Sequence, residues 1–224
     1  MTAEALERTT AAPPLLDLAR FAASPLARSP FDHLVVPGFI PASALPAIEA
    51  DYPRIARGGS FPAQSLACGP AMLALLDALQ SAGTAAAFGA KFGLDLAARP
   101  TMVTLRGQSR PKDGRIHTDS KSKLVTALIY LNSAWESPGG RLRLLNGPGD
   151  IEDYVVEVPP AAGTLLAFRC SDNAWHGHKP FAGPRRSIQL NWVTDESVVK
   201  RELGRHGFSA LVKRLVAPFS GEKT

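Results

Sequence analysis

Three residues of the sequence, His117, Asp119 and His176, have side-chain types and a spacing that suit a metal site. Residues i and i+2 of a strand project to the same side, so His117 and Asp119 can present an imidazole and a carboxylate to one point. A distant His176 would complete two histidines and one carboxylate on one face of a metal. This ligand set leaves the opposite coordination positions open and suits non-haem Fe(II) used for oxygen chemistry.

Nine residues after His176, Arg185 begins a segment suited to an acidic co-substrate. A carboxylate buried beside a metal needs a charged, hydrogen-bonded partner, and a guanidinium offers a planar, two-pronged one. Arg185 and Ser187 are two residues apart and should share one face of a strand, with Arg186 on the other face. The alternative is that both arginines are surface charges on an edge strand.

The remaining histidines have simpler interpretations. We expect His33, near the start of a short strand, to be an exposed or hydrogen-bonded ring. His178 follows His176 by two residues and would share its face in a regular strand. We prefer His176 as the ligand because of its sequence surroundings, and keep His178 as a fallback ligand or as a group that supports the metal or touches substrate.

These surroundings resemble a known family. The stretch from His117 to Trp192 resembles the Fe(II)/2-oxoglutarate-dependent dioxygenases, especially their prolyl-4-hydroxylase-like branch. That branch has His-x-Asp, a strand ending in Tyr-Leu-Asn, a Gly-Gly turn, a strand ending in Phe, a second histidine and an arginine that begins the last strand. The matching residues are His117-Thr118-Asp119, Tyr130-Leu131-Asn132, Gly139-Gly140, Phe168, His176 and Arg185. The resemblance covers roughly the C-terminal half of the chain.

The resemblance implies a double-stranded β-helix (jelly-roll) fold with His117, Asp119 and His176 as the catalytic iron ligands. It implies Fe(II) as the metal, 2-oxoglutarate and O2 as co-substrates, and ascorbate as a candidate accessory reductant. The implied reaction is hydroxylation of a C–H bond with decarboxylation of 2-oxoglutarate to succinate and CO2. Because Asp119 is present, the pattern that leaves room for a halide is absent, and halogenation is disfavoured.

Further residues are assigned around this centre. The residues expected to hold 2-oxoglutarate are Arg185, Ser187, Tyr130 and Arg106, and those expected to border the substrate are Asn191, Gln189 and Trp135. Tyr130 could instead be an ordinary core aromatic, and a loop tryptophan is more often simple packing. Arg106 departs from relatives that carry a tyrosine near this position. It could reinforce 2-oxoglutarate binding or reach an anionic substrate.

The elements that must position these residues are mostly strands. From Pro100 onward the sequence contains short β-rich segments separated by turn-forming stretches, which favours a sandwich or barrel over alternating βαβ units. These segments are Thr101–Arg106, Arg115–Asp119, Lys123–Asn132, Arg141–Leu145, Tyr154–Val158, Gly163–Arg169 and Arg185–Val193. Gly107–Gly114 resembles a mobile lid. The fold class is therefore mainly β with flanking helices.

The chain is expected to form a flexible segment at residues 1–30 and a single domain at residues 31–224. Within that domain, residues 31–99 should form a mostly helical buttress, residues 100–194 the jelly-roll core and residues 195–224 C-terminal helices. Pro70–Phe92 should be helical with a division at Gly83, and Asp195 should begin the C-terminal helix as its N-cap.

Composition narrows the classes of partner. No apolar run approaches the roughly 18 residues of a membrane span, and Met1–Pro14 lacks a secretory pattern, so we expect a cytoplasmic protein without a membrane anchor. The net charge of +5 is modest and not organised as a nucleic-acid stripe. Six basic residues bracket the expected metal strand, as a solvated rim or as a positive mouth for an anionic substrate: Arg106, Arg110, Lys112, Arg115, Lys121 and Lys123.

Three accounts of function remain at this point. The leading one is a dioxygenase acting on a small molecule or a protein residue. The second is a non-catalytic, cupin-like metal- or ligand-binding protein, which gives no reason for Arg185 and Ser187. The third, ranked last, is an oxygenase directed at nucleic acid through the basic loops.

Overall fold

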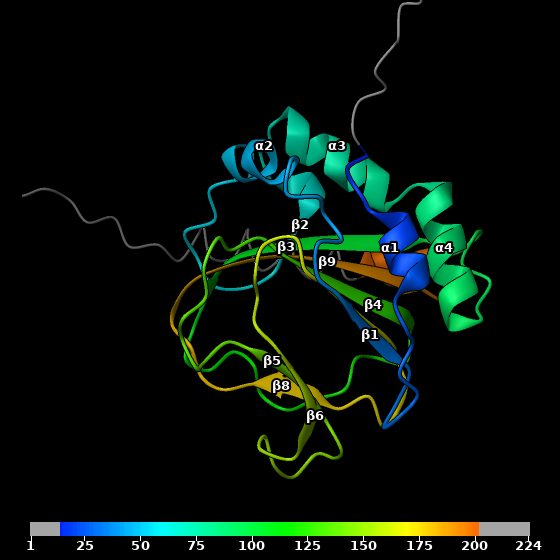
Figure 1. Ribbon diagram of the computed structural model, residues 1–224, viewed down its shortest axis with the longest axis vertical. Coiled ribbons are helices and arrows are strands. Elements are labelled where there is room, and N and C mark those ends of the chain that lie inside the picture. The colour runs from blue at the N-terminus through cyan, green and yellow to red at the C-terminus, as the bar shows by residue number, and fades with distance from the viewer. Residues whose placement is uncertain (1–13, 202–224) are drawn as a thin grey trace, which may run out of the picture.

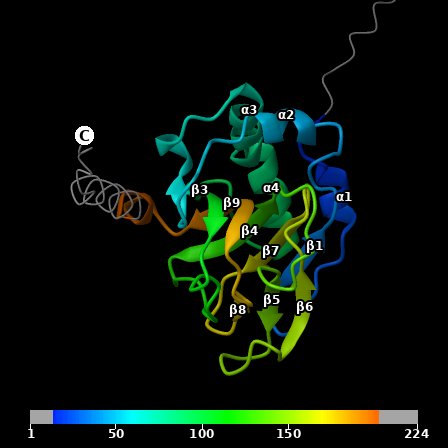
Figure 2. The same cartoon turned by 90° about the vertical axis from the view of Figure 1, so that its left-hand side faces the viewer.

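The computed structural model describes residues 14–201, and its strands form two antiparallel sheets that face each other (Figures 1 and 2). The larger sheet has the order β1 (His33–Val36), β7 (Leu165–Arg169), β4 (Lys123–Tyr130), β9 (Gly183–Val193), β3 (Thr101–Ser109), β2 (Phe61–Pro62). The smaller sheet has the order β6 (Tyr154–Val158), β5 (Leu142–Leu145), β8 (His176–His178). This arrangement is the double-stranded β-helix, and the predicted fold class is confirmed.

The helices lie on the outer side of the larger sheet (Figure 1). They are α1 (Leu18–Ala23), α2 (Leu45–Ala50), α3 (Pro70–Leu79) and α4 (Ala82–Phe92), with a short 3-10 turn at Ala63–Ser65. The break between α3 and α4 falls at Gln80–Ser81, not at Gly83 as predicted, because Ser81 caps α4 by accepting from the Thr84 backbone N–H. Among the described helices none alone has the length and apolarity of a membrane span, and only α3 and α4 together, bent by 45°, meet those two criteria.

The outward face of the larger sheet is packed against these helices. On β9 the alternate residues Ile188, Leu190 and Trp192 belong to the main hydrophobic core, and the Trp192 ring lies 4.7 Å from that of Phe88 on α4. Because side chains alternate along a strand, this packing commits the other set of β9 residues to the space between the sheets.

That inward set is aligned by the register of three neighbouring strands. Ser187 on β9 is paired with Arg106 on β3 and with Tyr130 on β4, so these three residues form one row across the sheet. The next row contains Gln189, paired with Thr104 and Leu128. Paired residues lie on the same face, so the register alone brings residues from three distant segments to one wall.

Three expectations about local structure need correction. Arg115–Asp119 is not a strand; it touches β8 through a single bridge between His117 and His176. The short strand β8 itself was not predicted. Gly107–Ser109, expected to begin a mobile lid, continues β3.

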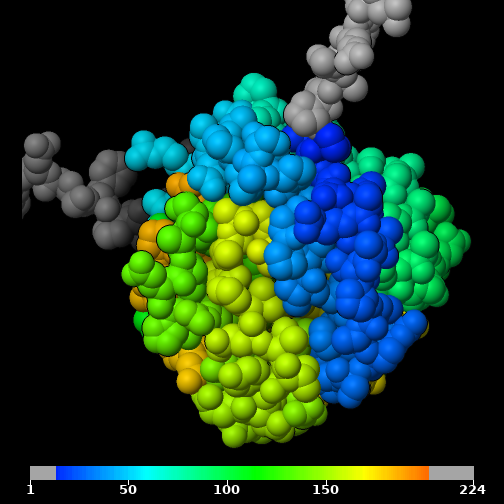
Figure 3. All heavy atoms as spheres, viewed as in Figure 1, coloured from blue at the N-terminus to red at the C-terminus, as the bar shows by residue number. Residues whose placement is uncertain are grey.

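The chain ends also differ from the predicted division. Residues 14–30 were expected to be flexible, but they contain α1, whose Phe21 is fully buried and stacked on Phe88 at 4.3 Å. In Figure 3 the blue N-terminal residues spread over one side of the molecule. At the other end, Asp195 accepts from the Ser197 backbone N–H at the start of a helical turn, as predicted. Residues 1–13 and 202–224, and the predictions that fall on them, lie outside the described residues.

Candidate active site

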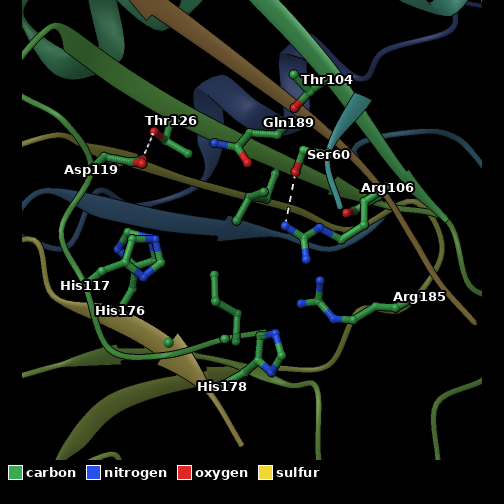
Figure 4. A pocket seen from close by; sticks show the side chains of 15 residues that line it. Ser60, Thr104, Arg106, His117, Asp119, Thr126, His176, His178, Arg185 and Gln189 are labelled. Atoms are coloured by element: carbon green, nitrogen blue, oxygen red, sulfur yellow. Dashed lines mark hydrogen bonds between the residues drawn. The ribbon is translucent and has the colours of Figure 1, made fainter. Parts of the chain in front are cut away.

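His117, Asp119 and His176 converge as the spacing predicted. One potential ligand atom from each lies within 4.8 Å of the other two. Two backbone hydrogen bonds, His117 N–H to His176 O at 3.0 Å and the reciprocal bond at 2.9 Å, hold the loop after β3 against β8. Figure 4 shows the two imidazoles side by side with the carboxylate above them.

Both imidazoles are oriented by backbone carbonyls. His117 Nδ1 lies 2.8 Å from the Arg115 carbonyl, and His176 Nδ1 lies 2.9 Å from the Ala174 carbonyl. These acceptors favour the tautomer with the proton on Nδ1, which leaves Nε2 as a lone-pair donor. Burial, helped by the nearby His117, lowers the pKa of His176 to about 4, so this imidazole is neutral at neutral pH. His176 therefore offers a neutral imidazole to a divalent metal, and the backbone contacts of both rings leave their Nε2 atoms free for it.

The Asp119 carboxylate is held by two neighbours from β4. Lys123 Nζ donates to Oδ1 at 2.7 Å and Thr126 Oγ1 donates to Oδ2 at 2.5 Å. Asn191 Nδ2 in turn donates to Thr126 Oγ1 at 2.7 Å. Burial alone would raise the pKa of Asp119, but the charge of Lys123 and the hydrogen bonds from Lys123 and Thr126 lower it below its usual value. Asp119 is thus an ionised carboxylate, as a metal ligand must be.

His178 does not join the triad. It shares the inward face of β8 with His176 and lines the same pocket, but in Figure 4 it lies away from the triad, below Arg185. Its Nδ1 lies 2.8 Å from the Lys179 carbonyl. Burial and the charge of Arg185 lower the pKa of His178 to about 4, so it is a neutral polar group on the pocket wall.

Arg185 is the group that fits an acidic co-substrate. Its side chain is buried, Nε donates to the Gly140 carbonyl at 2.8 Å, and no carboxylate among residues 14–201 forms an ion pair with it. A buried cation without a counter-charge is costly, so the site is arranged to receive an anion from outside the protein.

Tyr130 points to the same conclusion. It is fully buried beside Arg185, whose Cζ lies 5.4 Å from the ring centroid, and its hydroxyl has no hydrogen-bond partner among the described residues. A hydroxyl without a hydrogen-bond partner, next to a guanidinium without a counter-charge, forms a binding site for one carboxylate group. 2-Oxoglutarate can supply that carboxylate. Ser187 lies between Tyr130 and Arg106 in the same row and lines the pocket, and its contact with 2-oxoglutarate stays a prediction.

The Gly139-Gly140 turn positions Arg185. A Cβ at Gly139 would lie 2.3 Å from the Pro180 carbonyl, and one at Gly140, where φ is +75°, would lie 2.6 Å from the Trp135 ring. Only glycine fits there, so the Gly140 carbonyl can face Arg185. Trp135, expected to border the substrate, instead packs on Phe181 and donates to the Gly139 carbonyl at 3.0 Å. It braces the turn and does not line the pocket.

Arg106 reaches the pocket from the neighbouring strand. Its guanidinium donates to Ser60 Oγ at 3.1 Å and to Asp113 Oδ2 at 3.2 Å. Asp113 also accepts from the backbone and side chain of Arg110. Residues 110–114, predicted as part of a lid, are therefore tied to the site through Asp113.

The pocket between the sheets encloses about 110 Å³ and joins the triad to the two arginines. Gln189 also lines the pocket. Asn191, expected to border the substrate, is not among the lining residues and instead donates to Thr126 Oγ1. Sequence reasoning missed the roles of Ser60, Asp113 and Lys123. Thr126 shares the parity of Tyr130 on β4 and could have been found from that spacing, but nothing in the sequence marks Ser60.

Comparisons with known proteins agree with this geometry. Residues 108–194 match the family described as the 2OG-Fe(II) oxygenase superfamily, and this stretch includes the triad and Arg185. No curated protein sequence matches the chain significantly.

Solved structures show the same fold. A prolyl 4-hydroxylase from Phytophthora capsici is 21% identical with a TM-score of 0.50, covering 75% of this chain and 60% of that one. The viral collagen prolyl hydroxylase of Paramecium Bursaria Chlorella virus-1 is 14% identical with a TM-score of 0.50, covering 73% and 90%. A Pseudomonas putida prolyl-4-hydroxylase is 21% identical with a TM-score of 0.49, covering 79% and 90%. The stretch 108–194, which holds the assembled triad, is thus similar to the 2OG-Fe(II) oxygenase superfamily, and the geometry of the triad fits that similarity.

Proposed function

We propose that the protein hydroxylates a C–H bond of a small molecule or of a protein residue, with Fe(II) held by His117, Asp119 and His176. The chemistry that Fe(II), 2-oxoglutarate and dioxygen supply when bound is decarboxylation to succinate and CO2 coupled to oxidation of the C–H bond. The observation that carries the proposal is the buried, unpaired Arg185 in the same pocket as the triad.

The protein's own residues hold the metal ligands in place and orient 2-oxoglutarate. Two Nδ1–H donors to backbone carbonyls fix the histidine rings, while Lys123 and Thr126 fix the Asp119 carboxylate. Arg185 and Tyr130 receive the far carboxylate of 2-oxoglutarate and so set the orientation of its keto acid end.

A prolyl residue is one candidate target. The structural neighbours named above are described as prolyl hydroxylases, and the sequence carries the Tyr-Leu-Asn and Gly-Gly elements of that branch. The pocket is partly open to solvent, so the bulk of a large substrate would lie at its mouth.

The test is formation of succinate from 2-oxoglutarate by the Fe(II)-loaded protein, with ascorbate present and absent. The first measurement is made without substrate, and the second with prolyl peptides and with a panel of small metabolites. We expect slow turnover alone and acceleration by the true substrate. No turnover and no 2-oxoglutarate binding would favour the cupin-like alternative. Salt-sensitive binding of DNA or RNA with matching acceleration would favour the nucleic-acid alternative.

A further inference from the structure

We propose that Arg106 is the substrate-recognition residue of this site and that the primary substrate carries an oxyanion, a carboxylate or a phosphate. The inference rests on the proposed function and names the substrate class for the same pocket. Its basis is a second guanidinium, beside the one that fits 2-oxoglutarate, at the same end of the pocket. In Figure 4 Arg106 and Arg185 face each other across the space opposite the triad.

The charge of the site is not balanced by its expected occupants. Arg106, Arg110, Lys123 and Arg185 lie in or next to the pocket, and the carboxylates that pair with them are Asp113 and Asp119. The described side chains therefore leave an excess of two positive charges. Fe(II) and the 2-oxoglutarate dianion add equal and opposite charges, so the excess persists in the loaded site.

Arg106 also has hydrogen-bonding capacity to spare. A guanidinium has five N–H donors, and Ser60 and Asp113 accept from one nitrogen each. These two contacts fix the plane of the group while leaving other donors open to the pocket. The side chain is 27% exposed, so the group is accessible yet partly desolvated, which strengthens its attraction for an anion.

Arg185 and Tyr130 are the groups that fit the far carboxylate of 2-oxoglutarate. Among the described residues Arg185 lacks a counter-charge and the Tyr130 hydroxyl lacks a hydrogen-bond partner. Arg106 differs because it shares one carboxylate, Asp113, with Arg110. It is positioned by a loop that also carries Arg110, not by the turn that holds Arg185. Because Arg185 and Arg106 are held by different segments, they can bind two different anions, 2-oxoglutarate at Arg185 and the substrate at Arg106. A neutral prolyl peptide would leave Arg106 unused, whereas an organic acid or phosphate ester would not.

The test uses the Mn(II)-loaded protein with N-oxalylglycine, a non-reacting analogue of 2-oxoglutarate, to fill the Arg185 site. Propionate and methylphosphonate are the probes, titrated against chloride at constant ionic strength, and the midpoint of thermal unfolding is measured. Comparing the two probes separates a carboxylate from a phosphate preference. The variants are Arg106→Met, Arg106→Lys, Arg185→Met and Lys121→Met, the last removing an exposed cation outside the pocket.

We expect a probe-dependent rise of the midpoint in the unmodified protein and in Lys121→Met. The half-saturating probe concentration should rise at least tenfold in Arg106→Met and less in Arg106→Lys, which keeps the charge. An unchanged response in Arg106→Met, or no response in the unmodified protein, overturns the inference. So does a loss of N-oxalylglycine affinity in Arg106→Met as large as in Arg185→Met. Failure of the proposed function would look different, because the unmodified protein would not bind N-oxalylglycine at all.

Discussion

Lys123 Nζ lies 2.7 Å from Asp119 Oδ1, and both side chains are largely buried, at 15% and 8% exposure. The carboxylate of the triad therefore already forms an ion pair with Lys123, independently of a metal. A lysine at this position neutralises Asp119 in the metal-free protein and keeps it oriented. It also sets a competition, because Fe(II) and the ammonium group are attracted to the same carboxylate.

Replacing Lys123 with Met should destabilise the metal-free protein by about 3 kcal/mol, because the buried Asp119 carboxylate loses its counter-charge. A divalent metal can replace that charge, so the rise in unfolding temperature on adding Mn(II) should be larger in Lys123→Met than in the unmodified protein. Lys121→Met is the control, since Lys121 is 87% exposed in its pair with Asp172. Equal metal-induced shifts in all three proteins would contradict the competition.

The triad assignment predicts that His176→Ala and Asp119→Ala abolish Fe(II) binding and succinate formation. His178→Ala should keep metal binding, because His178 does not share the cluster of ligand atoms. Metal stoichiometry after gel filtration gives the readout, independent of turnover. If His176→Ala kept one tightly bound metal and His178→Ala lost it, His178 and not His176 would be the second histidine ligand.

Arg185→Met should raise the concentration of 2-oxoglutarate needed for half-maximal turnover by about 100-fold, because loss of a charged hydrogen-bonded partner costs about 3 kcal/mol. Tyr130→Phe should raise it by about fivefold, the effect of one hydrogen bond near 1 kcal/mol. Succinate formation is measured against 2-oxoglutarate concentration. Tyr130→Phe should leave stability unchanged or slightly higher, since its hydroxyl lacks a partner in the described structure.

The metal-free protein should lose stability as the pH falls from neutrality. Burial lowers the pKa of His176 and of His178 to about 4, from an ordinary value of 6.5. The unfolded chain therefore takes up protons first, so unfolding becomes easier as the pH drops from 6.5 towards 4. Denaturant unfolding at pH 7 and pH 5 measures the effect. His178→Asn, which can keep the contact made by Nδ1, should show a smaller loss than the unmodified protein.

Those parts of the site could be predicted from the sequence in which the geometry of a single strand sets the direction of the side chains. The pleat of β9 places Arg185, Ser187 and Gln189 on one face whatever the rest of the fold does. The row of Arg106, Ser187 and Tyr130 could not be derived this way, because it depends on the register of three strands separated by long loops. Contacts of loop residues, such as that of Ser60 with Arg106, depend entirely on tertiary structure.

The same distinction explains the wrong predictions. Trp135 adjoins the site in sequence order, but its ring packs on Phe181, 46 residues further along the chain, and this contact turns it away from the pocket. The helix break was predicted at Gly83 because glycine weakens helices. The position of the break is instead set by Ser81, which caps the N-terminus of α4. Residues 14–30 lack a motif, and their order comes from burial against α4.

That last point can be measured directly through Phe21. Its side chain is fully buried and contacts Phe39 and Phe88, with ring centroids 6.0 and 4.3 Å away. Phe21→Ala should lower the free energy of unfolding by about 3 kcal/mol, because it removes a large buried ring and leaves a cavity. Leu73→Ala, at a side chain that is 50% exposed, is the control and should change stability by less than about 1 kcal/mol. A neutral Phe21→Ala would mean that residues 14–30 do not contribute to the folded domain, and the division at residue 30 would then be correct.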